Sequence, residues 1–215
     1  MPGTKVPKND QLFFHGRGAF RRKNDTQYMS RQQTHDWEDD ARLAGRYTDE
    51  ADTRALETLF RRHLEATYAF ARRFLPTRED AEEAASETWL RAGRALRAGR
   101  FRGESRFKTW LLGIARLVCL ERLRQPRLPT LSLSGLTETA RGDWVLFAPG
   151  PEPVSDLDAA LDALSDDHKL VLTLCDLQGL TSAEAALVLG RTPAATKSLQ
   201  GRARRALREA LESLR

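Results

Sequence analysis

The last stretch of the chain, from Thr192 to Arg215, constrains the fold more than any other. Thr192 is a favourable N-cap, and Pro193 suits the first helical position, where its missing N–H costs nothing. Apolar residues then recur every three or four positions, which predicts one amphipathic helix. They are Ala195, Leu199, Ala203, Ala206, Leu207, Ala210, Leu211 and Leu214. The opposite side carries Lys197, Gln200, Arg204 and Arg208, and beside them run Ser198, Arg202 and Arg205. We therefore expect this side to face an anionic partner.

A second, shorter helix is predicted just before this one. Thr181 and Glu184 form a capping-box pattern, and Gly190 suits a C-terminal cap. Two helices joined by a tight glycine turn, the second rich in arginine, are typical of helix-turn-helix proteins, whose second helix lies in the major groove of DNA. The alternative is an ordinary amphipathic helix with a solvated basic face. The capped helix and the short turn upstream favour DNA binding.

Charge and composition narrow the class of partner. The net charge of +5 and the sequence pI near 9.5 favour an anionic partner, either nucleic acid or an anionic membrane. No apolar run reaches the length of a membrane span, and the N-terminus lacks a signal-peptide core, so we expect a cytoplasmic protein. Cys119 and Cys175 each lie in an apolar run, away from metal-ligand spacing. We expect them to be buried thiols in a reducing compartment, with no metal or cofactor.

The pattern along the chain predicts an all-α protein with two small helical domains. Residues 1–46 are polar and lack periodicity, so we expect a disordered or loosely structured extension, and the sequence leaves open whether Met29 is the true start. Residues 47–124 contain three predicted helices and form an N-terminal helix bundle. Prolines and glycines interrupt residues 125–153, which predicts a flexible linker. Residues 154–215 form a four-helix helix-turn-helix domain.

Several motifs resemble one family of transcription factors. Residues 56–124 resemble the first conserved domain of the extracytoplasmic-function, or group IV, sigma factors of the sigma-70 family. The matching motifs are REDAEE at residues 78–83, ETWLRA at 87–92 and FRGESRFKTWLLGIAR at 101–116. Residues 157–211 are similar to the second domain, through GLTSAEAALVLG at 179–190 and RARRAL at 202–207. The two stretches cover more than half of the chain in the order that the family has.

The resemblance implies a protein that binds core RNA polymerase, through its β′ and β subunits, and directs it to promoter DNA. The residues that would contact polymerase are Asp80, Glu83, Glu87 and Arg91. Those that would hold the melted minus-ten strand are Arg102, Glu104, Ser105, Arg106, Lys108 and Arg116, since a flipped base needs polar edges and its backbone needs cations. Those that would read the minus-thirty-five element are Thr196, Lys197, Ser198, Gln200, Arg202 and Arg205.

Some positions admit a second interpretation. Trp110 could be a platform for a base, but its helical spacing among leucine and isoleucine favours a place in the core. The acidic row of the polymerase face also suits the dipole of its own helix, which is a purely structural role. The chain departs from the family at residues 84–86, where Ala-Ala-Ser replaces Leu-Val-Gln and thins the expected polymerase surface. It departs again where Thr196 replaces valine, and where Gly201 costs about 1 kcal/mol against alanine in a helix.

The sequence bears on three classes of function. An enzyme has little support, because the chain has no glycine-rich phosphate loop, no HExxH motif and no nucleophile elbow. A stand-alone helix-turn-helix regulator would bind DNA as a dimer on paired half-sites. A sigma factor would bind DNA weakly alone and strongly with polymerase. The stretch FRGESRFKTWL at residues 101–111 favours the sigma factor, which we expect to be monomeric when free and not to bind membranes. Many members of the family are held inactive by an anti-sigma factor, although the sequence identifies none here.

Overall fold

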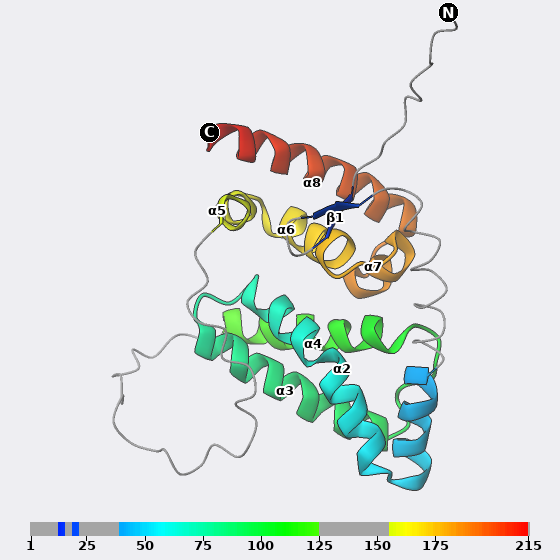
Figure 1. Cartoon of the computed structure of the whole chain (residues 1–215). Coiled ribbons are helices and arrows are strands. Elements are labelled where there is room, and N and C mark those ends of the chain that lie inside the picture. The colour runs from blue at the N-terminus through cyan, green and yellow to red at the C-terminus, as the bar shows by residue number, and fades with distance from the viewer. Residues whose placement is uncertain (1–12, 16–18, 22–38, 125–154, 215) are drawn as a thin grey trace, which may run out of the picture.

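The computed structural model describes residues 13–15, 19–21, 39–124 and 155–214 (Figure 1). The described part is helical, as predicted, apart from a short antiparallel hairpin of β1 (Phe13–His15) and β2 (Ala19–Arg21), in which Phe14 lies opposite Phe20. The sequence pattern did not predict these strands. Met29 and the predicted linker at 125–153 lie outside the described residues.

Four helices form the first half, which we call the N-terminal bundle. They are a helix over residues 39–50, α2 (Thr53–Arg72), α3 (Arg78–Arg97) and α4 (Phe107–Arg124). Side-chain caps fix two of the starts: Asp52 accepts from the backbone N–H groups of Arg54 and Ala55, and Thr77 accepts from that of Asp80. α2 ends at Arg72, one turn before Pro76.

The helix over residues 39–50 crosses the boundary expected at residue 46, so the last part of the predicted loose extension is ordered. Leu43, Ala44 and Tyr47 bury one side of it in the N-terminal bundle. Its buried Asp40 has a partner in α2, where His63 Nε2 lies 2.6 Å from Asp40 Oδ2. A polar segment can be ordered in this way because its few apolar residues share a face and its carboxylate is satisfied from another helix.

The remaining helices form the C-terminal bundle. They are α5 (Asp156–Asp162), α6 (Asp166–Leu172), the π-helix η1 (Thr173–Leu177), α7 (Ser182–Leu189) and α8 (Pro193–Ser213). The predicted capping box of Thr181 and Glu184 is present, as are the left-handed Gly190 and the cap of α8 by Thr192. The π-helix was not predicted: the Gln178 N–H donates to Thr173 O at 2.8 Å, which widens the end of α6 by one residue.

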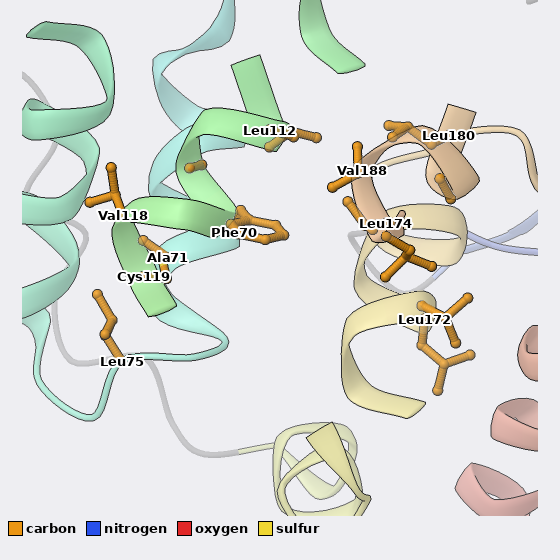
Figure 2. Packing of buried hydrophobic residues seen from close by; sticks show 14 of the residues in the cluster. Phe70, Ala71, Leu75, Leu112, Val118, Cys119, Leu172, Leu174, Leu180 and Val188 are labelled. Atoms are coloured by element: carbon orange, nitrogen blue, oxygen red, sulfur yellow. The ribbon is translucent and has the colours of Figure 1, made fainter. Parts of the chain in front are cut away.

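The two bundles pack directly against each other, with the C-terminal bundle stacked on α4 of the N-terminal bundle (Figure 1). One buried apolar cluster runs through both. Figure 2 shows Phe70 of α2 and Leu112 of α4 pointing toward Leu174 of η1 and Val188 of α7. The contact is therefore an apolar interface of the kind that excludes water.

Two glycines in the helix-turn-helix should respond to alanine in opposite directions. Gly190 ends α7 with φ +66°, a left-handed conformation, so Gly190→Ala is expected to destabilise the fold by about 1 kcal/mol. Gly201 lies in the middle of α8, and an added Cβ would meet no atom within 4 Å. Gly201→Ala should therefore stabilise by up to about 1 kcal/mol. Urea unfolding of both variants checks this, and two shifts of the same sign would contradict it.

Candidate polymerase and nucleic-acid interfaces

The exposed face of α8 carries most of the residues predicted to read duplex DNA. Ser198, Arg202 and Arg205 follow one another at spacings of four and three, which places them on one side of the helix, and all three are exposed. Lys197 is exposed beside them. Arg202, Arg205 and Lys197 form no ion pair with any residue that the structure describes. This face can therefore offer unpaired cations to phosphates and base edges.

Two of the predicted DNA-contacting residues do not belong to this face. Thr196 is fully buried, and its hydroxyl has no hydrogen-bond partner in the described part of the chain. The prediction that Thr196 touches DNA is wrong for this structure. Two signals pointed to burial: Thr196 lies three residues before the apolar Leu199, on the same side of the helix, and the family has valine at this position. Gln200 turns inward as well: its Nε2 donates to Asp176 Oδ2 of η1 at 3.2 Å, and Arg204 Nε donates to the same carboxylate at 3.0 Å.

The loop between α3 and α4 forms a pocket with a volume of about 330 Å³. Its walls are Arg100, Phe101, Arg102, Glu104, Ser105 and Trp110. Trp110 is half-buried: it packs against the apolar core of the N-terminal bundle, the position that the sequence favoured, and it also lines this pocket. The Phe101 and Trp110 ring centroids lie 5.2 Å apart, and both rings rest on the buried Phe107, at 5.5 and 5.6 Å. Arg100 and Phe101 were not among the single residues predicted to hold the minus-ten strand, although Phe101 is the first residue of the FRGESR motif and Arg100 directly precedes it.

The residues predicted to hold the minus-ten strand fall into two groups. Arg102 and Glu104 are exposed, and Ser105 lines the pocket with its hydroxyl 3.3 Å from Arg106 O. The other group faces the C-terminal bundle: Arg106 Nε lies 3.0 Å from Glu184 Oε1, and Lys108 Nζ donates to Gln178 O at 2.7 Å.

Burial changes the chemistry of the second group. It lowers the pKa of the Lys108 ammonium, because the charged form loses water that one carbonyl does not fully replace. Arg116, two turns further along α4, has a buried Nε with no partner in the described part of the chain. These cations are half-buried in this structure, and two of them, Arg106 and Lys108, contact the C-terminal bundle.

The predicted polymerase face of α3 is built from ion pairs that reach across to α4. Arg91 lies 2.7 Å from Glu87 of its own helix and 2.7 Å from Glu121 of α4, and these carboxylates raise the pKa of the Arg91 guanidinium. Glu83 pairs in the same way with Arg122 of α4, at 2.8 Å. Leu90 projects into solvent from the same helix, with 56% of its surface exposed.

The fourth residue of the predicted polymerase face, Asp80, is half-buried in the first turn of α3. The outer face of α3 therefore combines an exposed apolar side chain with a frame of ion pairs. A surface of this kind is typical of a protein-binding site. Its links to α4 could not be read from the sequence, because the partners lie some thirty or more residues away.

Of the two thiols that were expected to be buried, only Cys119 is fully so. Cys119 is buried and Cys175 is half-buried, both are free, and burial raises the pKa of the two thiols to about 12 and about 11. His63 is packed in the core, with its ring centroid 5.5 Å from that of Phe107.

Comparison with known proteins agrees with this geometry. Residues 59–127 match Sigma-70 region 2, and residues 155–207 match Sigma-70, region 4. The ECF RNA polymerase sigma factor SigM of Mycobacterium tuberculosis is 32% identical over 154 residues, which cover 71% of this chain and 75% of that protein. The RNA polymerase sigma-H factor of Pseudomonas aeruginosa is 30% identical over 188 residues, covering 82% of this chain and 96% of that protein.

Solved structures show the same fold. The structure of CnrH in complex with the cytosolic domain of CnrY superposes with a TM-score of 0.62 and 25% identity, over 81% of this chain and 98% of that chain. The sigma factor RpoE of Bartonella quintana, in complex with the anti-sigma factor NepR, gives a TM-score of 0.55 at 22% identity, over 74% of this chain and 98% of that chain, which supports the fold alone.

The chain belongs to the extracytoplasmic-function sigma factors of the sigma-70 family. It is an RNA polymerase sigma factor, which binds core polymerase and promoter DNA and directs promoter recognition. The alternative of a stand-alone regulator is not favoured. Among the helices that the structure describes, none is long and apolar enough to cross a membrane.

Proposed function

We propose that this sigma factor divides promoter recognition among three surfaces of its two bundles. The observation that carries the proposal is the exposed row of Ser198, Arg202 and Arg205 on α8, whose two arginines form no ion pair within the described residues. This row enters the major groove of the minus-thirty-five element. Lys197 supports it from the side, on phosphate or on a base edge.

The pocket between α3 and α4 receives one unstacked base of the minus-ten strand. Phe101 and Trp110 give it an aromatic wall, and aromatic stacking is worth about 1–3 kcal/mol per base. Glu104 and Ser105 supply polar groups for the edge of the base, while Arg102 lies where the strand backbone would pass. The cations of α4, Arg106, Lys108 and Arg116, hold the neighbouring phosphates.

The outer face of α3 binds core polymerase. Leu90 provides the apolar contact, and the pairs of Arg91 with Glu87 and of Glu83 with Arg122 surround it with fixed charges. We infer that the protein acts in the cytoplasm, where polymerase works, and that it has no catalytic role of its own. An anti-sigma factor is a partner to test for, since RpoE of Bartonella quintana is bound by one.

The test of the proposed function uses the purified chain and sigma-free core RNA polymerase. The two should co-elute, and the reconstituted enzyme should start transcription at discrete sites on genomic DNA of the host. Failure to bind polymerase, together with specific binding of duplex DNA by the chain alone, would overturn the proposal in favour of a free-standing regulator.

Reversing charge on the polymerase face should weaken holoenzyme formation. The double variant Glu83→Lys, Glu87→Lys removes two carboxylates and repels Arg91 and Arg122, so we expect about tenfold weaker binding to core polymerase. The matched control is Glu57→Lys, which breaks an exposed pair with Arg61 on α2. The control should bind core polymerase normally. Equal affinity for the double variant and the wild type would remove this assignment.

A further inference from the structure

A series of side-chain contacts links the helix over residues 39–50 to the pocket between α3 and α4, here called the base pocket. Asp40 of this helix is only 4% exposed, and its Oδ2 lies 2.6 Å from Nε2 of His63 on α2. The ring centroid of His63 lies 5.5 Å from that of Phe107. The ring of Phe107 in turn supports the aromatic wall of the base pocket. A buried carboxylate of the first helix is thus connected to the surface proposed to stack on a base.

The polar partners of Asp40 fix the orientation of the imidazole. Arg62, next to His63 on α2, forms an ion pair with the other oxygen of Asp40, and its second terminal nitrogen lies 3.0 Å from Asp39 Oδ2. An ionised carboxylate only accepts hydrogen bonds, so Nε2 of His63 carries the proton that Asp40 binds. Both oxygens of Asp40 are therefore used. The imidazole is held at a defined angle against Phe107, with 45° between the two ring planes.

The other end of the same helix contacts the start of the pocket loop. Thr48 Oγ1 donates to Leu96 O at 3.0 Å, and the Gly99 N–H donates to this same carbonyl at 2.9 Å. Arg97 Nε donates to the hydroxyl of Tyr47 at 3.0 Å. Gly99 has a φ of +64° and turns the chain out of α3 toward the pocket. Figure 1 shows the helix, in blue, at the end of the bundle where α3 connects to α4. The helix thus holds the pocket in two places, behind its aromatic wall and at the base of its loop.

A purely stabilising role for Asp40 and His63 is the alternative. Burying polar groups of this kind costs desolvation, and apolar residues of similar size often stabilise a core as well or better. Stability alone therefore explains the pair poorly. Hydrogen bonds fix the direction of a side chain, and a binding site needs its supporting groups held to within about 0.5 Å. The two roles differ in what they affect: a stabilising pair changes the folded fraction, and a positioning pair changes the contact with a base.

We propose that the helix over residues 39–50 braces the base pocket, and that Asp40 and His63 are positioning residues for the unstacked base. Both side chains are buried, so they act on the aromatic wall through Phe107 and do not touch the base. Stacking depends on the spacing and tilt of aromatic faces, so a shift of Phe107 changes the fit of a base. The inference rests on the proposed role of the pocket. It extends the minus-ten surface to a helix that precedes the match to Sigma-70 region 2 at residues 59–127.

The test compares a strand that has bases with one that has none. Fluorescein-labelled dT20 and an abasic strand of the same length carry the same phosphates, so the ratio of their dissociation constants measures the preference of the full chain for bases. Asp40→Ala should lower this base preference by at least about threefold, because the aromatic wall loses its fixed support. The matched control is Asp39→Ala on the same helix, which removes the pairs with Arg42 and Arg62 and leaves the bond between Asp40 and His63 in place. The control should keep the wild-type base preference.

Two further variants separate positioning from folding. Asp40→Asn keeps an oxygen that accepts from His63 Nε2, so it should restore most of the base preference. Thr48→Val keeps the size of the side chain but removes the donor to Leu96 O, and it should lower the base preference by about twofold. Far-UV circular dichroism under the binding conditions shows whether each variant is folded.

The outcomes distinguish the brace from the pocket itself. Equal weakening of both strands by Asp40→Ala would mean that the pair only stabilises the fold, and would overturn the brace. An unchanged base preference in both Asp40→Ala and Thr48→Val would do the same, while the pocket would stand. A wild-type chain that binds the two strands equally would instead overturn the proposed base pocket, and the brace with it.

Discussion

Phe107→Ala is expected to destabilise the N-terminal bundle by about 3–5 kcal/mol, the range for removal of a fully buried phenylalanine. Phe107 has no exposed surface and its ring touches four others: those of His63, Trp89, Phe101 and Trp110, with centroids 5.5–6.2 Å away. The cavity cannot collapse easily, because these rings belong to three helices and a loop. Urea unfolding followed by far-UV circular dichroism measures the loss.

The same substitution should damage the base pocket. Phe101 and Trp110 form the aromatic wall of the pocket and rest on Phe107. Removing this support should weaken binding of the single-stranded oligonucleotide dT20 even under conditions in which the variant is still folded. The control is Leu117→Ala, also on α4, where the side chain is 53% exposed. This variant should change stability by no more than about 0.5 kcal/mol. A loss below 1 kcal/mol for Phe107→Ala would show that the bundle repacks around the site.

Local signals predicted the helix-turn-helix well. Thr181 caps the start of α7, Gly190 ends this helix, and Thr192 caps the start of α8. Each of these residues acts on backbone groups within four residues of it. Such contacts need nothing from the rest of the chain, so a pattern of a few letters is enough to predict them. The same holds for the spacing that places Ser198, Arg202 and Arg205 on one side of α8.

Contacts between distant segments account for what the sequence did not predict. Helical spacing groups residues on one face but does not say what covers that face, so it could not show that Trp110, which packs against the core, also lines a pocket. Lys108 meets an acceptor seventy residues away, at Gln178, and Asp40 meets His63 across twenty-three. The π-helix η1 widens α6 by a single residue, and no local composition signals that change.

Arg202→Ala is expected to reduce transcription from the native promoter by at least about tenfold, because one bidentate base contact is worth about 1–3 kcal/mol of discrimination. Arg202 is exposed in the middle of the proposed recognition face and has no ion pair within the described residues. Its removal should therefore leave the fold unchanged, and co-elution with core polymerase should be normal. Single-round transcription with the reconstituted enzyme provides the measurement.

The matched control is Arg208→Ala, which removes an exposed arginine from the same helix further from its N-terminus, where base edges are out of reach. We expect Arg208→Ala to reduce transcription less than twofold, and by the same factor on every promoter sequence. A base contact has a further signature: the penalty of Arg202→Ala should disappear on promoters whose minus-thirty-five guanines are replaced, because wild type then loses the same contact. An equal penalty on every promoter would mean that Arg202 binds phosphate, and normal transcription would remove it from the interface.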